Sequence, residues 1–118
     1  MPSSDPTRRF LDIVDNVERI ERYVQGLDLP GLLASEMALD AVERCFSRIS
    51  EAAVKLGDDA DALCPGIAWH GIRRLGNYLR HEYGRVDQSR LWAFIGADLP
   101  PLKTACVAAI AKLSAAKR

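Results

Sequence analysis

Apolar residues recur at three- and four-residue steps along most of the chain, which is the spacing of one buried face of an α-helix. The first such run predicts a helix that begins at Pro6, with Ser4 or Asp5 as its N-cap, and ends near Gly26. Its apolar stripe consists of Phe10, Ile13, Val14, Val17, Ile20, Tyr23 and Val24.

A second and longer stripe predicts a helix from Leu33 to Leu56, after a break at residues 27–32. Gly57 suits the end of this helix, and residues 58–67 are expected to be irregular. The stripe consists of Met37, Ala38, Ala41, Val42, Cys45, Phe46, Ile49, Ala52, Ala53 and Leu56.

Three further helices are predicted in the second half of the chain. They cover Trp69–Tyr83, then 88–97 with Asp87 as N-cap, then Leu102–Ala116, with a break at residues 100–101, which are both proline. No segment alternates with a period of two, so the pattern predicts an all-α fold, an antiparallel bundle of four to five helices.

Composition adds bounds to this picture. The 118 residues make one domain, 1–118, with 48% apolar and 27% charged residues and a formal net charge of zero. Neither nucleic acid nor membrane is therefore favoured by global charge. No apolar leader opens the chain and no apolar run approaches the roughly 20 residues that span a bilayer, so we expect a cytoplasmic protein without membrane contact.

The three cysteines, Cys45, Cys64 and Cys106, are far apart in the sequence and form no CxxC pair. That spacing disfavours a zinc ribbon or a thioredoxin-type site, and the odd number fits a reducing compartment. We expect packing roles for all three thiols, and no metal site.

Residues 69–87, WHGIRRLGNYLRHEYGRVD, resemble the HepT-like toxins of the HEPN superfamily. Residues 41–53 also resemble the second helix of that family, and the resemblance extends over roughly residues 8–103. The matching positions are Trp69, Asn77, His81, Tyr83, Val86, Asp87, Trp92, Asp98, Leu99 and Pro100.

The resemblance implies a HEPN-like helical bundle that forms a two-fold homodimer. It also implies a metal-independent endoribonuclease without cofactor, built on an Arg-x4–6-His motif near the dimer axis. Such proteins are toxins of a type VII-like toxin–antitoxin pair. The resemblance further implies that a cognate MntA-type nucleotidyltransferase antitoxin silences the toxin by adding AMP to the motif tyrosine, here Tyr83.

The chain departs from the family pattern at Gly76, where the family has an arginine. Arg74 still meets the spacing rule, with six residues between it and His81. Glycine within a helix is unfavourable relative to alanine. Two interpretations of Gly76 stay open, a close approach between helices or the loss of a catalytic arginine.

Helix geometry places Arg74 and His81 within about 20° of each other on one face, and Asn77 lies on the same edge. Cleavage of RNA without metal needs an acid–base group, a fixed positive charge on the phosphate and a group that orients them. Histidine, arginine and asparagine supply these three functions. Arg74, His81 and Asn77 are therefore the candidate catalytic residues, and two copies of His81 across a dimer axis can divide the acid and base roles.

Residues 70–90 carry five arginines against two acidic residues and also hold both histidines of the chain. Within this cluster, Arg73, Arg80 and Arg85 are candidates for contact with the RNA backbone, although such a cluster can also serve solubility alone. An AMP group on Tyr83 would place a negative phosphate beside Arg80 and block RNA.

Two other functions remain open from the sequence. With Gly76 in place of arginine, the protein can be a non-catalytic module that only pairs with the nucleotidyltransferase, and a third alternative is a helical scaffold dimer without a site. Trp69 and Trp92 are expected to be core or dimer-interface anchors. Arg44 and Glu51 share a helix face, as a solvated or interfacial pair.

Overall fold

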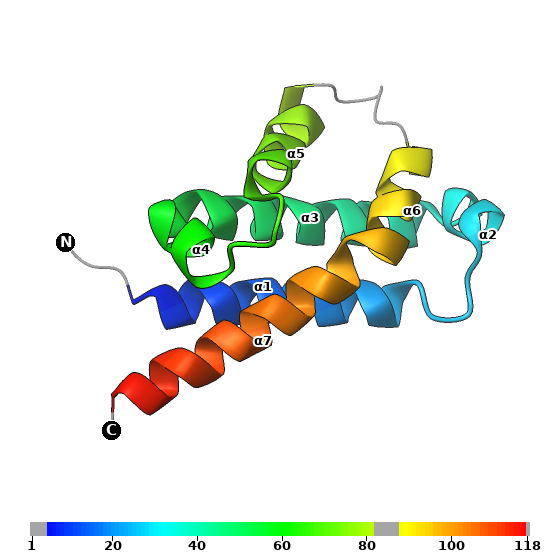
Figure 1. The fold of residues 1–118 in the computed structure, drawn as a ribbon. Coiled ribbons are helices and arrows are strands. Elements are labelled where there is room, and N and C mark those ends of the chain that lie inside the picture. The colour runs from blue at the N-terminus through cyan, green and yellow to red at the C-terminus, as the bar shows by residue number, and fades with distance from the viewer. Residues whose placement is uncertain (1–4, 82–87, 118) are drawn as a thin grey trace.

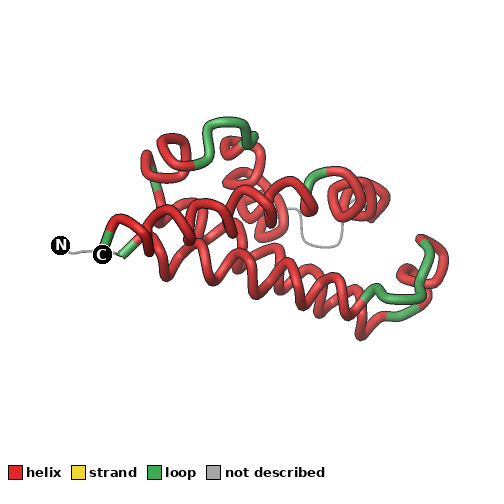
Figure 2. Tube along the Cα trace, turned by 60° about the horizontal axis from the view of Figure 1, so that its bottom comes forward, coloured by secondary structure: helices red, strands yellow, loops and turns green. Residues whose placement is uncertain are grey.

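The computed structural model describes residues 5–81 and 88–117, with the side chains of residues 77, 78, 80 and 81 outside the description. These residues form helices with no strand among them, which confirms the all-α prediction (Figures 1 and 2). The helices are α1 (Pro6–Tyr23), α2 (Leu29–Ala34), α3 (Glu36–Leu56), α4 (Asp58–Leu63), α5 (Trp69–His81), α6 (Gln88–Ala97) and α7 (Leu99–Ala116).

Two long helices, α1 and α3, lie side by side and antiparallel, and the third long helix, α7, packs on α1 (Figure 1). Helix α5 packs on α3 and rises away from the three long helices, while α6 links it to α7. Because α5 contacts the body mainly through α3, one side of α5 faces the body and the other faces outward.

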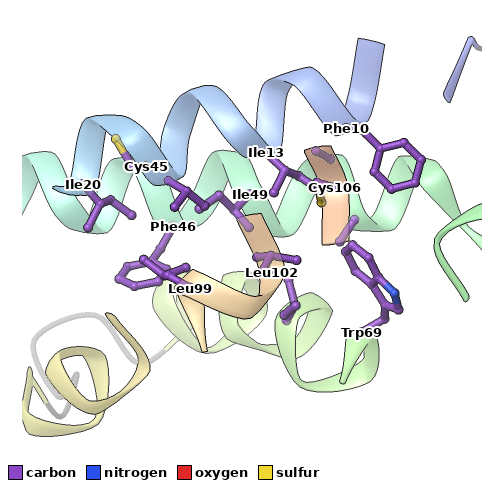
Figure 3. Close-up of a cluster of buried hydrophobic side chains, with 14 of the residues drawn as sticks. Phe10, Ile13, Ile20, Cys45, Phe46, Ile49, Trp69, Leu99, Leu102 and Cys106 are labelled. Carbon is purple, nitrogen blue, oxygen red and sulfur yellow. The ribbon is translucent and has the colours of Figure 1, made fainter. Parts of the chain in front are cut away.

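The core lies where α1, α3 and α7 meet the first turn of α5 (Figure 3). The ring of Phe46 on α3 meets that of Phe94 on α6 edge to face, with 5.5 Å between the ring centres. Trp69 is fully buried, so it is a core anchor, and Trp92 packs partly buried against the same core. The members contributed by α1 and α7 are Phe10, Ile13, Val17, Ile20, Leu99, Leu102, Cys106 and Ala109.

The predicted break at residues 27–32 is confirmed only in part: residues 24–28 are not helical, but α2 begins at Leu29. Asp28 caps this short helix by accepting the backbone N–H of Gly31 at 2.8 Å, and Pro30 lies in the first turn, where no N–H is needed. The second long helix consequently starts later than predicted, at Glu36 with Ser35 as its N-cap.

The same local chemistry explains two other corrections. Residues 58–61 include three aspartates at the start of α4, where negative charge favours a helix, so the predicted irregular segment is partly helical. The prolines at residues 100–101 lie in the first turn of α7 and do not separate it from Leu99. The break lies instead between α6 and α7, whose axes bend by 48°.

Two predicted stripe positions are also wrong. Met37, in the first turn of α3, is 82% exposed, and Tyr23, the last residue of α1, is 37% exposed. The three cysteines, by contrast, are buried and unpaired, which confirms their packing role. In the part of the chain that the structure describes, no single helix is long and apolar enough to cross a membrane, whereas α6 and α7 pass that test only as a bent pair.

Candidate functional site

The first turn of α5 is anchored by Trp69. The indole ring is buried, and its Nε1–H donates to the carbonyl oxygen of Cys64 at 3.0 Å. A buried tryptophan needs such a partner for its N–H group. Cys64 Sγ in turn donates to the carbonyl oxygen of Ala105 on α7 at 3.5 Å, so these two bonds connect the start of α5 to α7. Figure 3 shows Trp69 and Cys106 in the same cluster of buried side chains.

The middle of α5 is attached to α3 by one hydroxyl group. Ser50 is 2% exposed, and its Oγ donates to the carbonyl oxygen of Arg73 at 2.9 Å. The same Oγ accepts the backbone N–H of Gly76 at 3.1 Å. Ser50 thus satisfies both its donor and an acceptor position inside the helix–helix contact, and it sets the position of α5 along α3.

The Arg73 side chain caps the C-terminal end of α3. Its Nε–H donates to the carbonyl oxygen of Ala53 at 3.2 Å, and Nη2 donates to that of Gly57 at 2.9 Å. Nη2 also lies 3.5 Å from a carboxylate oxygen of Asp61 on α4. The last carbonyls of a helix lack partners within the helix, so a guanidinium placed there satisfies them and favours the negative end of the helix dipole.

Arg74 points the other way. It is exposed, and no ion pair or side-chain hydrogen bond joins it to any residue within the described ranges. His70, one turn earlier on α5, is exposed as well. Because α5 continues as a helix through His81, residues 70, 74, 77 and 81 share one face, with Arg74 and His81 about 10.5 Å apart along the axis. These four residues are called the outer stripe below.

Comparison with known proteins decides the family. The family model described as "Ribonuclease HepT-like" matches residues 13–109, most of the chain. The chain belongs to the HepT-like ribonuclease family. A protein of Thermococcus cleftensis named "Probable ribonuclease HepT" is 32% identical over 92 residues, which cover 78% of this chain and 84% of the relative. "Putative RNase MJ1380" of Methanocaldococcus jannaschii is 25% identical over 103 residues, 87% of this chain and 94% of the relative. No solved structure matches the chain.

Gly76 is the position at which the resemblance led us to expect an arginine. Here it is buried, and its backbone lies close enough to α3 to donate to Ser50. This contact supports the first interpretation of the glycine, a close approach between helices. A side chain at position 76 would start from the α3 side of α5, whereas Arg74 starts from the exposed side.

The outcome for the other predicted site residues follows from these positions. Arg73, predicted to contact RNA, has a guanidinium engaged with α3 and α4, and its RNA contact stays a prediction. Asn77, Arg80 and His81 lie in α5, but their side chains are outside the described part of the chain, as are Tyr83 and Arg85 entirely. Among residues with described side chains, no group of three His, Cys, Asp or Glu is placed to hold a metal ion.

Sequence reasoning left out one member of the outer stripe. His70 was counted only as part of a basic cluster, yet it lies four residues before Arg74 and seven before Asn77. These steps put it on the same helix face, and that spacing was the available signal. The stripe therefore has a titratable ring at each end and an arginine between them.

Proposed function

We propose that this HepT-like protein is a metal-independent endoribonuclease and the toxin of a toxin–antitoxin pair, with Arg74 and His81 as its catalytic residues. The observation that carries the proposal is the continuity of α5 through His81, with Arg74 two turns earlier exposed and engaging none of the residues that the structure describes. The family relatives named as ribonucleases support the same reaction class.

The chemistry assigned to the stripe is transesterification at the ribose. One imidazole removes the proton of the 2′-hydroxyl while that oxygen attacks the phosphorus. Arg74 binds the phosphate oxygens as negative charge builds on them, and Asn77 orients the phosphate or the ring. The bond from phosphorus to the 5′-oxygen then breaks, and a second acid protonates that oxygen, which leaves a cyclic 2′,3′-phosphate and a free 5′-hydroxyl.

A homodimer supplies the second acid most simply. If two copies of α5 meet across a two-fold axis, His81 of one copy acts as base and the partner's His81 as acid. Helix α5 suits this arrangement because it projects from the body and packs mainly on α3 (Figure 1). Sedimentation of the purified protein is expected to give the mass of a dimer.

An RNA cleavage assay tests the proposed reaction. Wild-type protein is compared with Arg74→Ala and His81→Ala in the presence of EDTA, with Lys112→Ala as a control at an exposed cation of α7. We expect cleavage by the wild type and by the control, and a loss of about 100-fold or more for either stripe variant. Undiminished cleavage by His81→Ala removes His81 from the mechanism.

Regulation is proposed to act at Tyr83. A cognate MntA-like nucleotidyltransferase would transfer AMP from ATP to the tyrosine oxygen, with release of pyrophosphate. The adduct adds a negative phosphate and a base next to the outer stripe, which opposes RNA binding by charge and by volume. Intact mass measurement after incubation with that enzyme and ATP should show the gain of AMP, and Tyr83→Phe should prevent it.

A second candidate function is supported by Gly76, because the arginine of the family pattern is missing there. In that case the protein only pairs with the nucleotidyltransferase and cuts nothing. Induced expression in a bacterium separates the two functions. Growth arrest that requires both Arg74 and His81 supports the nuclease, whereas harmless expression with stable partner binding supports the module.

A further inference from the structure

A groove of about 320 Å³ lies between α1 and α3, away from the outer stripe. Its walls carry Arg9 and Asn16 from α1 and Arg44, Arg48 and Lys55 from α3. Consecutive helical residues point about 100° apart. Since Ser50 is turned toward α5 while the next two residues of α3 line the groove, the groove and α5 are on different sides of α3.

Asn16, which lines the groove, carries an unsatisfied polar atom. Asn16 is 5% exposed, and its Nδ2–H donates to the carbonyl oxygen of Asp12 at 2.8 Å. A carbonyl can only accept, so this bond fixes which end of the amide is Oδ1. Of the buried side-chain nitrogens and oxygens that the structure describes, only Asn16 Oδ1 has no hydrogen-bond partner. A buried carbonyl oxygen left alone is costly, and it points to a ligand with an O–H or N–H group.

Two arginines that line the groove have no carboxylate ion pair among the described residues. Arg9 lies 3.6 Å from Asp12, and Lys55 lies 2.9 Å from Glu51, so these cations have carboxylate partners. Lys55 first, and then Arg44 and Arg9, hold the pKa of Glu51 below its usual value. Arg44 and Arg48 form no ion pair with a carboxylate in residues 5–81 or 88–117. Arg44 acts on Glu51 at longer range, and Arg48 interacts with the thiol of Cys45. Two guanidinium groups without a carboxylate ion pair in these ranges, beside a buried acceptor, favour a ligand that is both an anion and a hydrogen-bond donor.

We propose that this groove binds a ribonucleotide, with its phosphate on Arg44 and Arg48 and a ribose hydroxyl or base N–H group donating to Asn16 Oδ1. A nucleotide unit fits the groove, because small-molecule sites begin at about 300 Å³. The unit belongs either to an RNA chain or to a free nucleotide, and the chemistry of recognition is the same for both. The groove does not include His81, so a result on nucleotide binding here neither supports nor contradicts the proposed cleavage reaction.

Two binding measurements separate the two sources. Titration calorimetry with AMP tests a free nucleotide, and fluorescence anisotropy with a short labelled RNA tests a nucleotide within a chain. The RNA titrations use the His81→Ala background, so that cleavage does not deplete the probe. Both are repeated with Arg44→Ala/Arg48→Ala, with Asn16→Leu, and with Lys112→Ala, which removes an exposed cation outside the groove.

The double arginine variant is expected to weaken binding by about 100-fold, since each charge-assisted hydrogen bond corresponds to about a tenfold change. Asn16→Leu should weaken it by about three- to tenfold while the melting temperature stays the same or rises, because the substitution has a similar size and removes the lone buried oxygen. That opposite movement of affinity and stability is not expected of a residue that only packs. Lys112→Ala should bind like the wild type.

Each result has a fixed meaning. Groove-dependent binding of AMP assigns the site to free nucleotides, and groove-dependent binding of RNA without AMP assigns it to the chain of an RNA. The proposal is overturned if neither probe binds, or if both groove variants bind as tightly as the wild type. It is also overturned if the double arginine variant turns a dimer into monomers and loses binding in parallel, since the groove is then an interface between copies.

Discussion

Arg73 and Arg74 are neighbours of the same residue type, and the structure gives them opposite surroundings. Arg73 donates to two carbonyl oxygens at the end of α3 and lies near Asp61. Arg74 is exposed and engages none of the described residues. A single step of about 100° around the helix separates a residue that holds α5 in place from one that is available to a substrate.

This difference divides α5 into two faces with different expected roles. On the inner face, Trp69, Arg73 and Gly76 are engaged with other helices, so substitutions there should lower stability. On the outer stripe, His70 and Arg74 are exposed, so substitutions there should change the reaction and leave the fold alone. The predictions below test that division, from the largest expected effect to the smallest.

The largest effect is expected for Arg74→Ala. Loss of the positive charge at the phosphate should lower the cleavage rate by about 100-fold or more, as removal of a single transition-state donor does elsewhere. The free energy of unfolding should change by no more than about 0.5 kcal/mol, as is usual for an exposed residue. Urea denaturation and cleavage are measured on the same sample. If the cleavage rate falls only in proportion to a loss of folded protein, Arg74 supports the fold as the inner-face residues do, and the proposed difference between the two faces of α5 is wrong.

Arg73→Ala should lower the stability of the fold and leave the cleavage rate unchanged, which is the opposite of Arg74→Ala. Two partly buried carbonyl oxygens lose a charged donor, and the free energy of unfolding should fall by about 2 kcal/mol. Cleavage, expressed per folded molecule, should stay near the wild-type value. Arg73→Lys is the matched control, because it keeps the charge but cannot reproduce the fork that reaches both carbonyls. A stable Arg73→Ala protein with weak cleavage would instead support the predicted RNA contact of Arg73.

Gly76→Arg introduces the arginine that the family resemblance implies at this position. It tests whether a side chain on the inner face contributes to cleavage or only disturbs the packing of α5 on α3. The new side chain starts from a buried position beside Ser50, so overpacking should lower the unfolding free energy by about 1–3 kcal/mol. We expect no gain in cleavage, since position 76 is turned away from Arg74. Faster cleavage by this variant would show that the site is assembled from the inner face, and that Gly76 marks a lost catalytic arginine.

Ser50→Ala should have a somewhat smaller effect on stability. It removes the bond to the carbonyl of Arg73 and leaves the N–H of Gly76 without this acceptor, for a loss of about 1–2 kcal/mol in the free energy of unfolding. Ser47→Ala on the same helix, at a partly exposed position, is the control. If both variants are equally stable, Ser50 does not set the position of α5.

The sequence predicted the long helices because their apolar stripes repeat over several turns, and burial of Phe10, Val17 and Phe46 follows from that repetition. It missed α2 and α4, since six-residue helices show no repeat: α2 relies on its Asp28 cap, and α4 on the aspartates of its first turn. Helix geometry applied to residues 69–87 predicted three residues of the outer stripe, Arg74, Asn77 and His81, and missed His70. The roles of Ser50, Arg73 and Asn16 were not predictable, because each depends on a partner or a missing partner that only the folded chain defines.

The smallest expected effect is a loss of stability at alkaline pH, through the Cys106 thiol in the core near the start of α5. Trp69 donates to the carbonyl of Cys64, and burial first, then the neighbouring Cys64, raises the pKa of Cys106 from 9.0 to about 12. The folded protein therefore keeps the thiol proton between these values while the unfolded chain loses it. The stability that this thiol contributes is complete below pH 9.0 and is lost as pH rises toward 12.

At about pH 10, the wild type should have lost about 1.4 kcal/mol of unfolding free energy through Cys106, because one pH unit between the two pKa values corresponds to about that amount. Cys106→Ala should be less stable near neutrality because it leaves a small cavity, but its stability should decline less between about pH 8 and about pH 10. The comparison of the two slopes cancels the titration of lysines and tyrosines that both proteins share. Parallel slopes would mean that the Cys106 thiol has the same pKa in the folded and unfolded protein, and that burial does not hold its proton.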